Sequence, residues 1–157
     1  MEILTKDRER AKDLVGALYK MQATVFTLML KSWGVHWNIV SENFISYHEL
    51  MSSLYTDLID VTDRVAEGIG SLGYLAPASM SIYKELSYVE DGTGLEQSSA
   101  QNMLKVVLED LYKVEFSTSK VAEEAIKIKN KAIENMAGEV SEKLRVYIYK
   151  LRKTVVL

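Results

Sequence analysis

The sequence of 157 residues lacks cysteine altogether and contains one proline and two histidines. Without cysteine there is no disulfide, no thiolate nucleophile, no iron–sulfur cluster and no cysteine-based zinc site. No apolar run approaches the roughly 20 residues that a membrane span requires, and the charged start MEILTKDRERAKD is unlike a signal peptide. These absences exclude thiol chemistry and lead us to expect a soluble, cytoplasmic protein that has no contact with a membrane.

The composition is that of an ordinary globular chain. Hydrophobic residues make up 48% and charged residues 26%, and the formal net charge is −3. A chain of this length can bury a real hydrophobic core as one domain, which we expect to cover residues 1–157. The small negative net charge gives no overall attraction to nucleic acid.

Apolar residues recur at alternating steps of three and four along four stretches of the chain. This period is typical of helices that bury one face, and four such stretches predict a four-helix bundle. The stretches cover residues 14–28, 51–72, 104–128 and 133–155.

The breaks between these stretches predict how the helices connect. Residues 38–44 separate the first two helices, and the segment PASMSIYKEL inside the longer break 73–97 predicts one short helix. A connection of about 25 residues is long for neighbouring antiparallel helices and favours a crossover, as in ferritin-like folds. We therefore predict an all-α, ferritin-like four-helix bundle with a short extra helix in the long connection between helices 2 and 3.

Two smaller signals predict where the later helices begin. The pattern Ser98-x-x-Gln101 is a capping box, which predicts the start of the third helix. The segment Asn135 to Gly138 is a possible joint before the fourth helix, although the apolar stripe continues through it.

Both histidines, His36 and His48, lie within the segment KSWGVHWNIVSENFISYHELMSS. Neutral imidazole is the commonest side-chain metal ligand, so this clustering suggests a metal site. The zinc-protease pattern H-E-x-x-H fails, because Ser52 stands where its second histidine would be. The di-iron pattern Glu-x-x-His also fails, because the residues three positions before the histidines are Trp33 and Ile45, and neither is acidic.

A third arrangement uses two carboxylates on the second helix. Asp63 and Glu67 are four positions apart and therefore emerge on one face. Fifteen residues of helix separate His48 from Asp63 by about 22 Å, so one helix cannot bring them to one ion. Two antiparallel copies around a two-fold axis near residues 55–57 would place each carboxylate pair opposite the partner's histidines and would form two identical sites. Oxygen and imidazole donors suit iron, manganese or zinc. A hydrogen-bonded core histidine and a solvated acidic face are the alternatives.

The segment LKSWGVHWNIVSENFISYHEL, followed by DVTDRVAEGIGSLGYLAPASM, resembles the Dps family of ferritin-like proteins. The likeness is dense over residues 25–87. It implies a hollow dodecamer with di-iron ferroxidase sites at two-fold interfaces. His36 and His48 would come from one subunit, and Asp63 and Glu67 from its partner. It also implies that Fe(II) is oxidised, typically by hydrogen peroxide, and stored as ferric mineral, which protects against oxidative damage.

The chain departs from the family at one ligand position. The family usually has aspartate where this chain has Ser52, and a serine hydroxyl is a poor iron ligand. We expect the iron position at His36, Asp63 and Glu67 to survive and the one near His48 to be weaker. Glu49 and Trp37 are accessory candidates. Glu49 would support the second position or mineral growth, and Trp37 would pack near the site, as a radical sink or as core.

The resemblance also suggests two further properties, which are DNA binding and a route by which iron enters the shell. The last fifteen residues, KLRVYIYKLRKTVVL, carry five basic residues and no acidic one, whereas the start of the chain is balanced in charge. Twelve copies would sum to a basic surface that binds DNA weakly and loses it with salt. Glu139 and Glu142 are candidates for a three-fold pore. The rival functions are a structural or DNA-compacting shell with weak ferroxidase activity, and an oligomeric bundle without metal chemistry.

Overall fold

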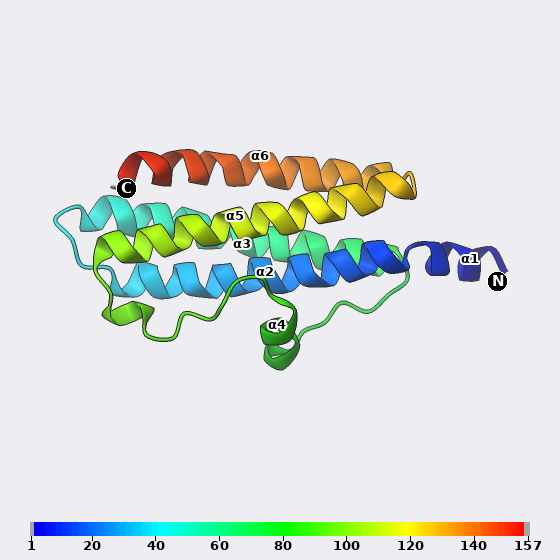
Figure 1. Cartoon of the computed structure of the whole chain (residues 1–157), viewed down its shortest axis with the longest axis horizontal. Coiled ribbons are helices and arrows are strands. Elements are labelled where there is room, and N and C mark those ends of the chain that lie inside the picture. Colours follow the sequence, from blue (N-terminus) through cyan, green and yellow to red (C-terminus); the bar gives the residue numbers. More distant parts are fainter. Residues whose placement is uncertain (1, 156–157) are drawn as a thin grey trace.

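The computed structural model describes residues 2–155, with side chains from residue 6 onward. Within this range the chain is helical and has no strand (Figure 1). The helices are α1 (Glu2–Arg10), α2 (Lys12–Asn38), α3 (Phe44–Ser71), α4 (Met80–Leu86), the short 3-10 helix η1 (Leu95–Gln97), α5 (Ala100–Lys127) and α6 (Lys131–Thr154).

Four long helices, α2, α3, α5 and α6, form the bundle (Figure 1). Their apolar stripes form one core in which most of the residues expected from the three-four periodicity are fully buried. Leu18, Leu54, Leu104 and Leu151, one from each helix, are all 0% exposed. The predicted all-α, ferritin-like bundle is therefore confirmed. No described helix is long and apolar enough to cross a membrane.

The connection between α3 and α5 runs along the outside of α2 and contains α4, the predicted short helix (Figure 1). A buried glutamine on α2 fixes it there. Gln22 donates one hydrogen bond to the Tyr83 hydroxyl at 2.9 Å and another to the Pro77 carbonyl at 3.1 Å. Burial raises the pKa of the Tyr83 phenol. The crossover is thus tied to the bundle by polar contacts as well as apolar ones.

The predicted starts of the last two long helices are wrong. The cap of α5 is Ser99, whose side chain accepts from the Asn102 amide at 3.2 Å, so the capping signal at Ser98 is one residue early. Helix α6 begins after Asn130, whose side-chain oxygen accepts from the Ile133 amide at 3.1 Å. The turn before it uses the left-handed Lys129, with φ of 59°. The segment 135–138 lies inside α6, where continuous apolar packing outweighs its glycine.

A buried ion pair joins α2 to α5. The Lys31 ammonium lies 2.5 Å from Asp110, and the two side chains are 5% and 1% exposed. Lys113 supplies a second cation, 2.8 Å from the other carboxylate oxygen. These two cations compensate the buried carboxylate, and loss of Asp110 would leave the Lys31 ammonium as an uncompensated buried charge.

A second polar network joins α3 to α6. The Tyr147 hydroxyl donates to Asp57 at 2.5 Å, and Lys143 lies 3.2 Å from the same carboxylate. Burial, followed by the Asp57 carboxylate, raises the pKa of the Tyr147 phenol. These contacts hold α6 along the face of α3 that carries Asp57, which leaves another face of α3 exposed.

Candidate metal centre

The end of α2 and the start of α3 bring the two histidines together. Helix α2 ends at Asn38 and α3 begins at Phe44, so the intervening turn reverses the chain within five residues. Ile39, at the first position of this turn, is buried and anchors it in the core. The His36 and His48 rings stack with centroids 3.7 Å apart and planes inclined by 19°. The clustering predicted from the sequence is therefore real in the folded chain.

Reciprocal hydrogen bonds fix the two rings. His36 Nδ1 lies 2.9 Å from the His48 carbonyl, and His48 Nδ1 lies 2.9 Å from the His36 carbonyl. A carbonyl oxygen can only accept, so each Nδ1 carries a proton and donates it. In the neutral rings the lone pairs are then on the Nε2 atoms, for which no described residue is a hydrogen-bond partner. A metal-ligating histidine is typically held in this way, with one nitrogen bonded to a carbonyl and the other free to bind.

Aromatic rings surround this pair. Phe44 packs against His48 with ring centroids 5.0 Å apart, and Tyr55 meets His36 edge-on at 5.2 Å. Trp33 stacks on Tyr55 at 5.5 Å and also contacts Trp37 at 5.0 Å. The site thus has an apolar, aromatic wall on the side of the bundle.

Trp37 is not a core residue in this chain. Its side chain is 59% exposed, although its ring touches Trp33. Of the two roles expected from the sequence, burial in the core is therefore wrong. The reason is helical geometry, because Trp37 follows His36 by one residue and projects away from the core face that Val35 occupies.

The two carboxylates lie elsewhere on α3. Asp63 and Glu67 are both exposed, and neither has a hydrogen bond or ion pair with any described residue. About 22 Å of helix separates Asp63 from His48. Among residues 2–155, no three His, Asp or Glu side chains come close enough to hold a metal ion. A single chain therefore brings the imidazoles together and leaves the carboxylates apart from them.

The remaining predicted site residues flank His48 on α3. Ser52 is one turn beyond it and half-buried, and Glu49 is exposed. Glu49 faces a shallow groove between α3 and the end of α6, together with Lys150 and Lys153. This position directs Glu49 toward α6 rather than toward the imidazole pair.

The sequence reasoning missed two aromatic residues of the site. From the sequence, Trp33 is notable only because it is not acidic, and Tyr55 only because it lies near the proposed two-fold axis at residues 55–57. Both touch the site through ring contacts between α2 and α3. The signal that was available is the i, i+4 spacing of Trp33 and Trp37, which places two indoles on one helix face.

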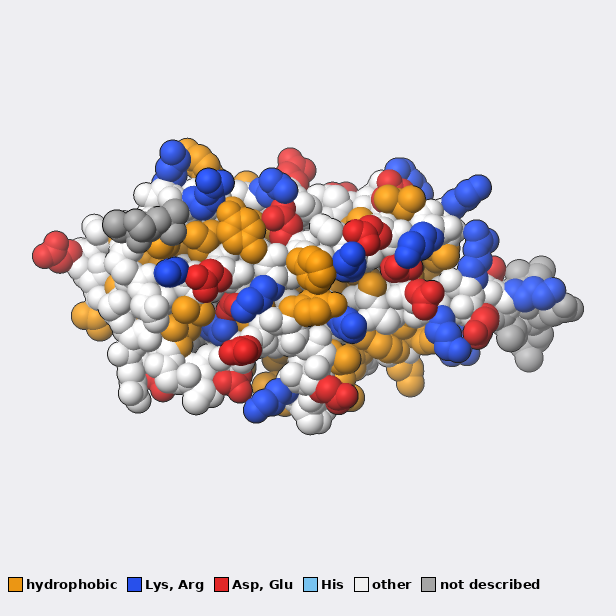
Figure 2. Space-filling model, in the orientation of Figure 1, with side chains coloured by type: hydrophobic (Ala, Val, Ile, Leu, Met, Phe, Trp, Pro, Cys, Tyr) orange, Lys and Arg blue, Asp and Glu red, His pale blue; other side chains and the backbone are white. Residues whose placement is uncertain are grey.

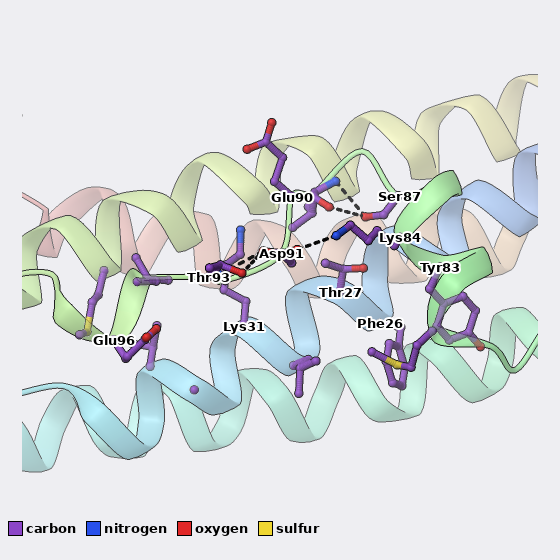
Figure 3. A pocket seen from close by; sticks show the side chains of 18 of the residues that line it. Phe26, Thr27, Lys31, Tyr83, Lys84, Ser87, Glu90, Asp91, Thr93 and Glu96 are labelled. Atoms are coloured by element: carbon purple, nitrogen blue, oxygen red, sulfur yellow. Dashed lines mark hydrogen bonds and ion pairs between the residues drawn. The ribbon is translucent and has the colours of Figure 1, made fainter.

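A large groove of about 980 Å³ lies beside the site, between α2 and the crossover (Figure 3). Its apolar lining includes Leu30, Trp37 and Met80, which are 42%, 59% and 60% exposed. On the crossover side, Thr93 and the Lys84 ammonium approach Asp91, which lowers the pKa of that carboxyl (Figure 3). The groove thus extends the exposed apolar surface from the neighbourhood of the imidazole pair to α4.

The charges on the surface are mixed. Over the face drawn in Figure 2, basic and acidic side chains interleave along the helices. Glu139, one of the two predicted pore residues, lies eight residues into α6 and pairs with Arg64 at 2.5 Å.

Comparison with known proteins gives the family of the chain. The ferritin-like domain model matches residues 15–156. An uncharacterized protein of Haemophilus influenzae is 31% identical over 105 residues, which are 67% of this chain and 64% of that protein. The DNA protection during starvation protein of Brevibacillus brevis is 32% identical over 100 residues, 63% of this chain and 66% of that protein. The matched segment spans less than two thirds of the length of these relatives.

Solved structures agree with this fold along most of the chain. Antigen TpF1 from Treponema pallidum gives a TM-score of 0.90 at 23% identity and covers 95% of each chain. A Dps protein from Bacillus brevis gives a TM-score of 0.87 at 22% identity, covering 93% of this chain and 97% of that one. The chain therefore belongs to the ferritin-like family, and the resemblance to Dps proteins expected from its sequence is confirmed.

Proposed function

We propose that this protein is a ferroxidase and iron-storage protein that binds its substrate, ferrous iron, between two copies of the chain. The observation that carries the proposal is the imidazole pair, in which both Nδ1 protons are used by carbonyl groups. Both Nε2 lone pairs are thereby left for metal. One solved neighbour, from Vibrio cholerae, is described as a member of a broad superfamily of ferritin-like diiron-carboxylate proteins.

The partner copy supplies the carboxylates. If two α3 helices pack antiparallel about an axis near residues 55–57, Asp63 and Glu67 of one copy lie opposite His36 and His48 of the other. The exposed face supports this packing, because Ile59 is 48% exposed between the two half-sites. Two unpaired carboxylates then meet two imidazoles with free nitrogens, which is a donor set that suits ferrous iron and also admits zinc or manganese.

The side chains then have separate tasks. The His36 imidazole binds and orients the first ferrous ion, His48 belongs to the second position, and the anionic carboxylates favour the higher charge of the ferric product. Ser52 cannot replace a carboxylate, so the second iron position near His48 is weaker. Hydrogen peroxide is the preferred oxidant in this proposal, and ferric mineral collects inside a homododecameric cage. The proposed location is the cytoplasm.

An anaerobic ferrous titration followed by peroxide tests this function. We expect the wild type to consume peroxide as it oxidises iron, and the double variant His36→Ala/Asp63→Ala to lose both activities. Equal, slow oxidation by both proteins would refute the ferroxidase. Light scattering supplies the companion measurement, because a monomer cannot assemble the shared site.

A structural or DNA-compacting shell is the second candidate, and the replacement of a ligand by Ser52 favours it. The basic side chains at the end of α6, including Lys150 and Lys153, would then contact phosphate groups. A gel shift at low and moderate salt distinguishes this candidate. Binding that weakens steeply with salt, together with slow iron oxidation, is the pattern expected of the shell.

A further inference from the structure

The side of the chain beside the proposed iron site carries both an apolar groove and an exposed leucine. The groove lies between α2 and the crossover, and Leu30 and Trp37, which are 42% and 59% exposed, belong to its lining. Leu75, in the crossover before α4, is 89% exposed, the highest value among the described large apolar side chains. An open apolar groove and a protruding apolar side chain on one chain are the complementary parts of a surface that binds its own copy.

The crossover is fixed at two heights along α2. The Tyr19 hydroxyl donates to the Leu75 carbonyl at 3.0 Å, so Leu75 lies level with Tyr19. Farther along, the Tyr83 ring of α4 packs on Phe26 with centroids 4.8 Å apart (Figure 3). The segment from Leu75 to Tyr83 therefore lies over the first half of α2, and the groove is lined by α2 residues from Phe26 to Asn38.

The proposed two-fold axis crosses α2 at Leu28. The axis passes residues 55–57 of α3, and residue 56 is eight positions after His48. Because His36 stacks on His48 and α2 runs antiparallel to α3, the matching residue of α2 is eight positions before His36, which is Leu28 (Figure 1). Positions that are equally far from Leu28 on either side therefore face each other across the axis.

This symmetry relates Leu75 to Trp37. Tyr19, which marks the height of Leu75, is nine positions before Leu28, and Trp37 is nine positions after it. We infer, on the basis of the two-fold packing in the proposed function, that Leu75 of one copy packs on the exposed Trp37 ring of the other copy.

The same symmetry places α4 of one copy in the groove of the other. Phe26, which marks the height of α4, is two positions before Leu28, and Leu30 is two positions after it. Met80 and Ile82 of α4 are 60% and 40% exposed, and they lie opposite Leu30 of the second copy in this arrangement. The exposed apolar side chains of the crossover are thus buried by those of the groove.

The contact gives the crossover a part in the proposed iron site. Trp37 touches Trp33, whose ring stacks on Tyr55 beside His36. Leu75 of the second copy, seated on Trp37, shields this aromatic wall from water on its outer side. The site is then completed by the crossover of the second copy as well as by its carboxylates.

The absence of cysteine makes the contact directly testable, because an introduced pair of thiols is the only pair present. In Leu75→Cys/Trp37→Cys, about 27 Å of α2 separates the two heights within one chain, so a short bis-maleimide cannot join them there. Between copies it should produce covalent dimers on a denaturing gel, and no larger species. Leu75→Cys/Tyr149→Cys is the matched control, since Tyr149 is 64% exposed but lies on α6, and it should give no covalent dimer.

The outcomes separate the contact from the proposed function. Covalent dimers only in the Leu75→Cys/Trp37→Cys protein support the contact. If light scattering shows assembled protein that gives no covalent dimer, the contact is wrong, even where the wild type oxidises iron. If the dimers form and wild-type oxidation is no faster than that of His36→Ala/Asp63→Ala, the contact stands and the proposed function is wrong. A monomeric wild type overturns both.

Quenching of Trp37 fluorescence supplies a second measurement that needs no crosslink. The chain has two tryptophans, so Trp37 is alone in a Trp33→Phe background. In assembled protein we expect Leu75→Ser to increase the quenching of Trp37 by acrylamide several-fold, because the indole loses its cover, whereas Tyr149→Ser leaves it unchanged. Equal quenching with and without Leu75→Ser, in proteins of the same size by light scattering, overturns the contact.

Discussion

The two halves of the proposed site differ in how completely one chain builds them. At the α2–α3 turn, His36 and His48 are stacked, hydrogen-bonded to each other's backbone and backed by aromatic rings. Farther along α3, Asp63 and Glu67 extend into solvent without a described partner. The difference indicates that folding of one chain brings the proposed nitrogen ligands together, whereas the proposed association would bring the oxygen ligands to them.

The largest expected effect is the loss of iron oxidation when either the histidine half or the carboxylate half of the proposed site is removed. His36→Ala and Asp63→Asn should each reduce peroxide-dependent iron oxidation to the uncatalysed rate, because each removes a ligand from the better-formed iron position. Stopped-flow absorbance of ferric iron measures it. Ser53→Ala, an exposed change on α3, is the control and should retain the wild-type rate. Full activity in Asp63→Asn would remove the carboxylate half from the proposal.

Mixing the two inactive variants sharpens the comparison. If each site combines two chains as proposed, a mixed pair of His36→Ala and Asp63→Asn copies has one site with both defects and one with none. Co-refolded or co-expressed mixtures should therefore regain activity that neither variant has alone. Separately assembled proteins combined without subunit exchange are the control. No recovery in mixtures shown by mass spectrometry to be mixed would contradict a shared site.

The free energy of unfolding should depend strongly on the bundle contacts that hold the histidine half of the proposed site. It should depend very little on the carboxylate half. Asp110→Ala leaves the Lys31 ammonium buried without its carboxylate, and we expect a loss of about 3–5 kcal/mol in the free energy of unfolding. Glu67→Gln changes an exposed, unpaired side chain and should stay within about 0.5 kcal/mol. Urea unfolding followed by circular dichroism, at one protein concentration, compares them. Equal losses would mean that the carboxylate half also supports the fold.

The smallest expected effect comes from restoring the missing ligand. Ser52→Asp places a carboxylate one turn from His48 and should tighten the second ferrous ion by roughly tenfold, or about 1.4 kcal/mol. Anaerobic calorimetry with ferrous iron measures this change. Ser52→Ala serves as its control, since it removes the hydroxyl without adding charge. An unchanged titration in Ser52→Asp would show that position 52 does not face the second ion.

The bundle was predictable from the sequence because the apolar residues that recur at helical spacing are the ones that the helices bury. Residues such as Leu18 and Leu104 recur at helical spacing and are fully buried. Helix starts were harder to predict. Ser98 and Ser99 are adjacent candidates for one cap, and only the backbone geometry selects Ser99. Asn130, the cap of α6, follows Lys129, whose backbone is left-handed. The sequence around Lys129 does not predict that conformation.

The pairing of the two histidines was predictable from the sequence, whereas the surroundings of the pair were not. The clustering of His36 and His48 was visible in the sequence, but their exchange of hydrogen bonds depends on the register between two helices. The contacts of Trp33 with Tyr55 depend on the same register. Spacing within one helix is fixed by its period, whereas spacing between helices is fixed by the turn that joins them. The approach of carboxylates from a second copy lies beyond any single chain and stays a prediction.

Because each imidazole bonds the carbonyl of the other histidine, the length of the segment 39–43 sets the register between α2 and α3. Apart from the buried Ile39, its side chains can vary, because the bonds run to main-chain oxygens, but one residue more or less would shift α3 against α2 and separate both rings from their carbonyl partners. Positions 40–43 should therefore tolerate substitution but not insertion.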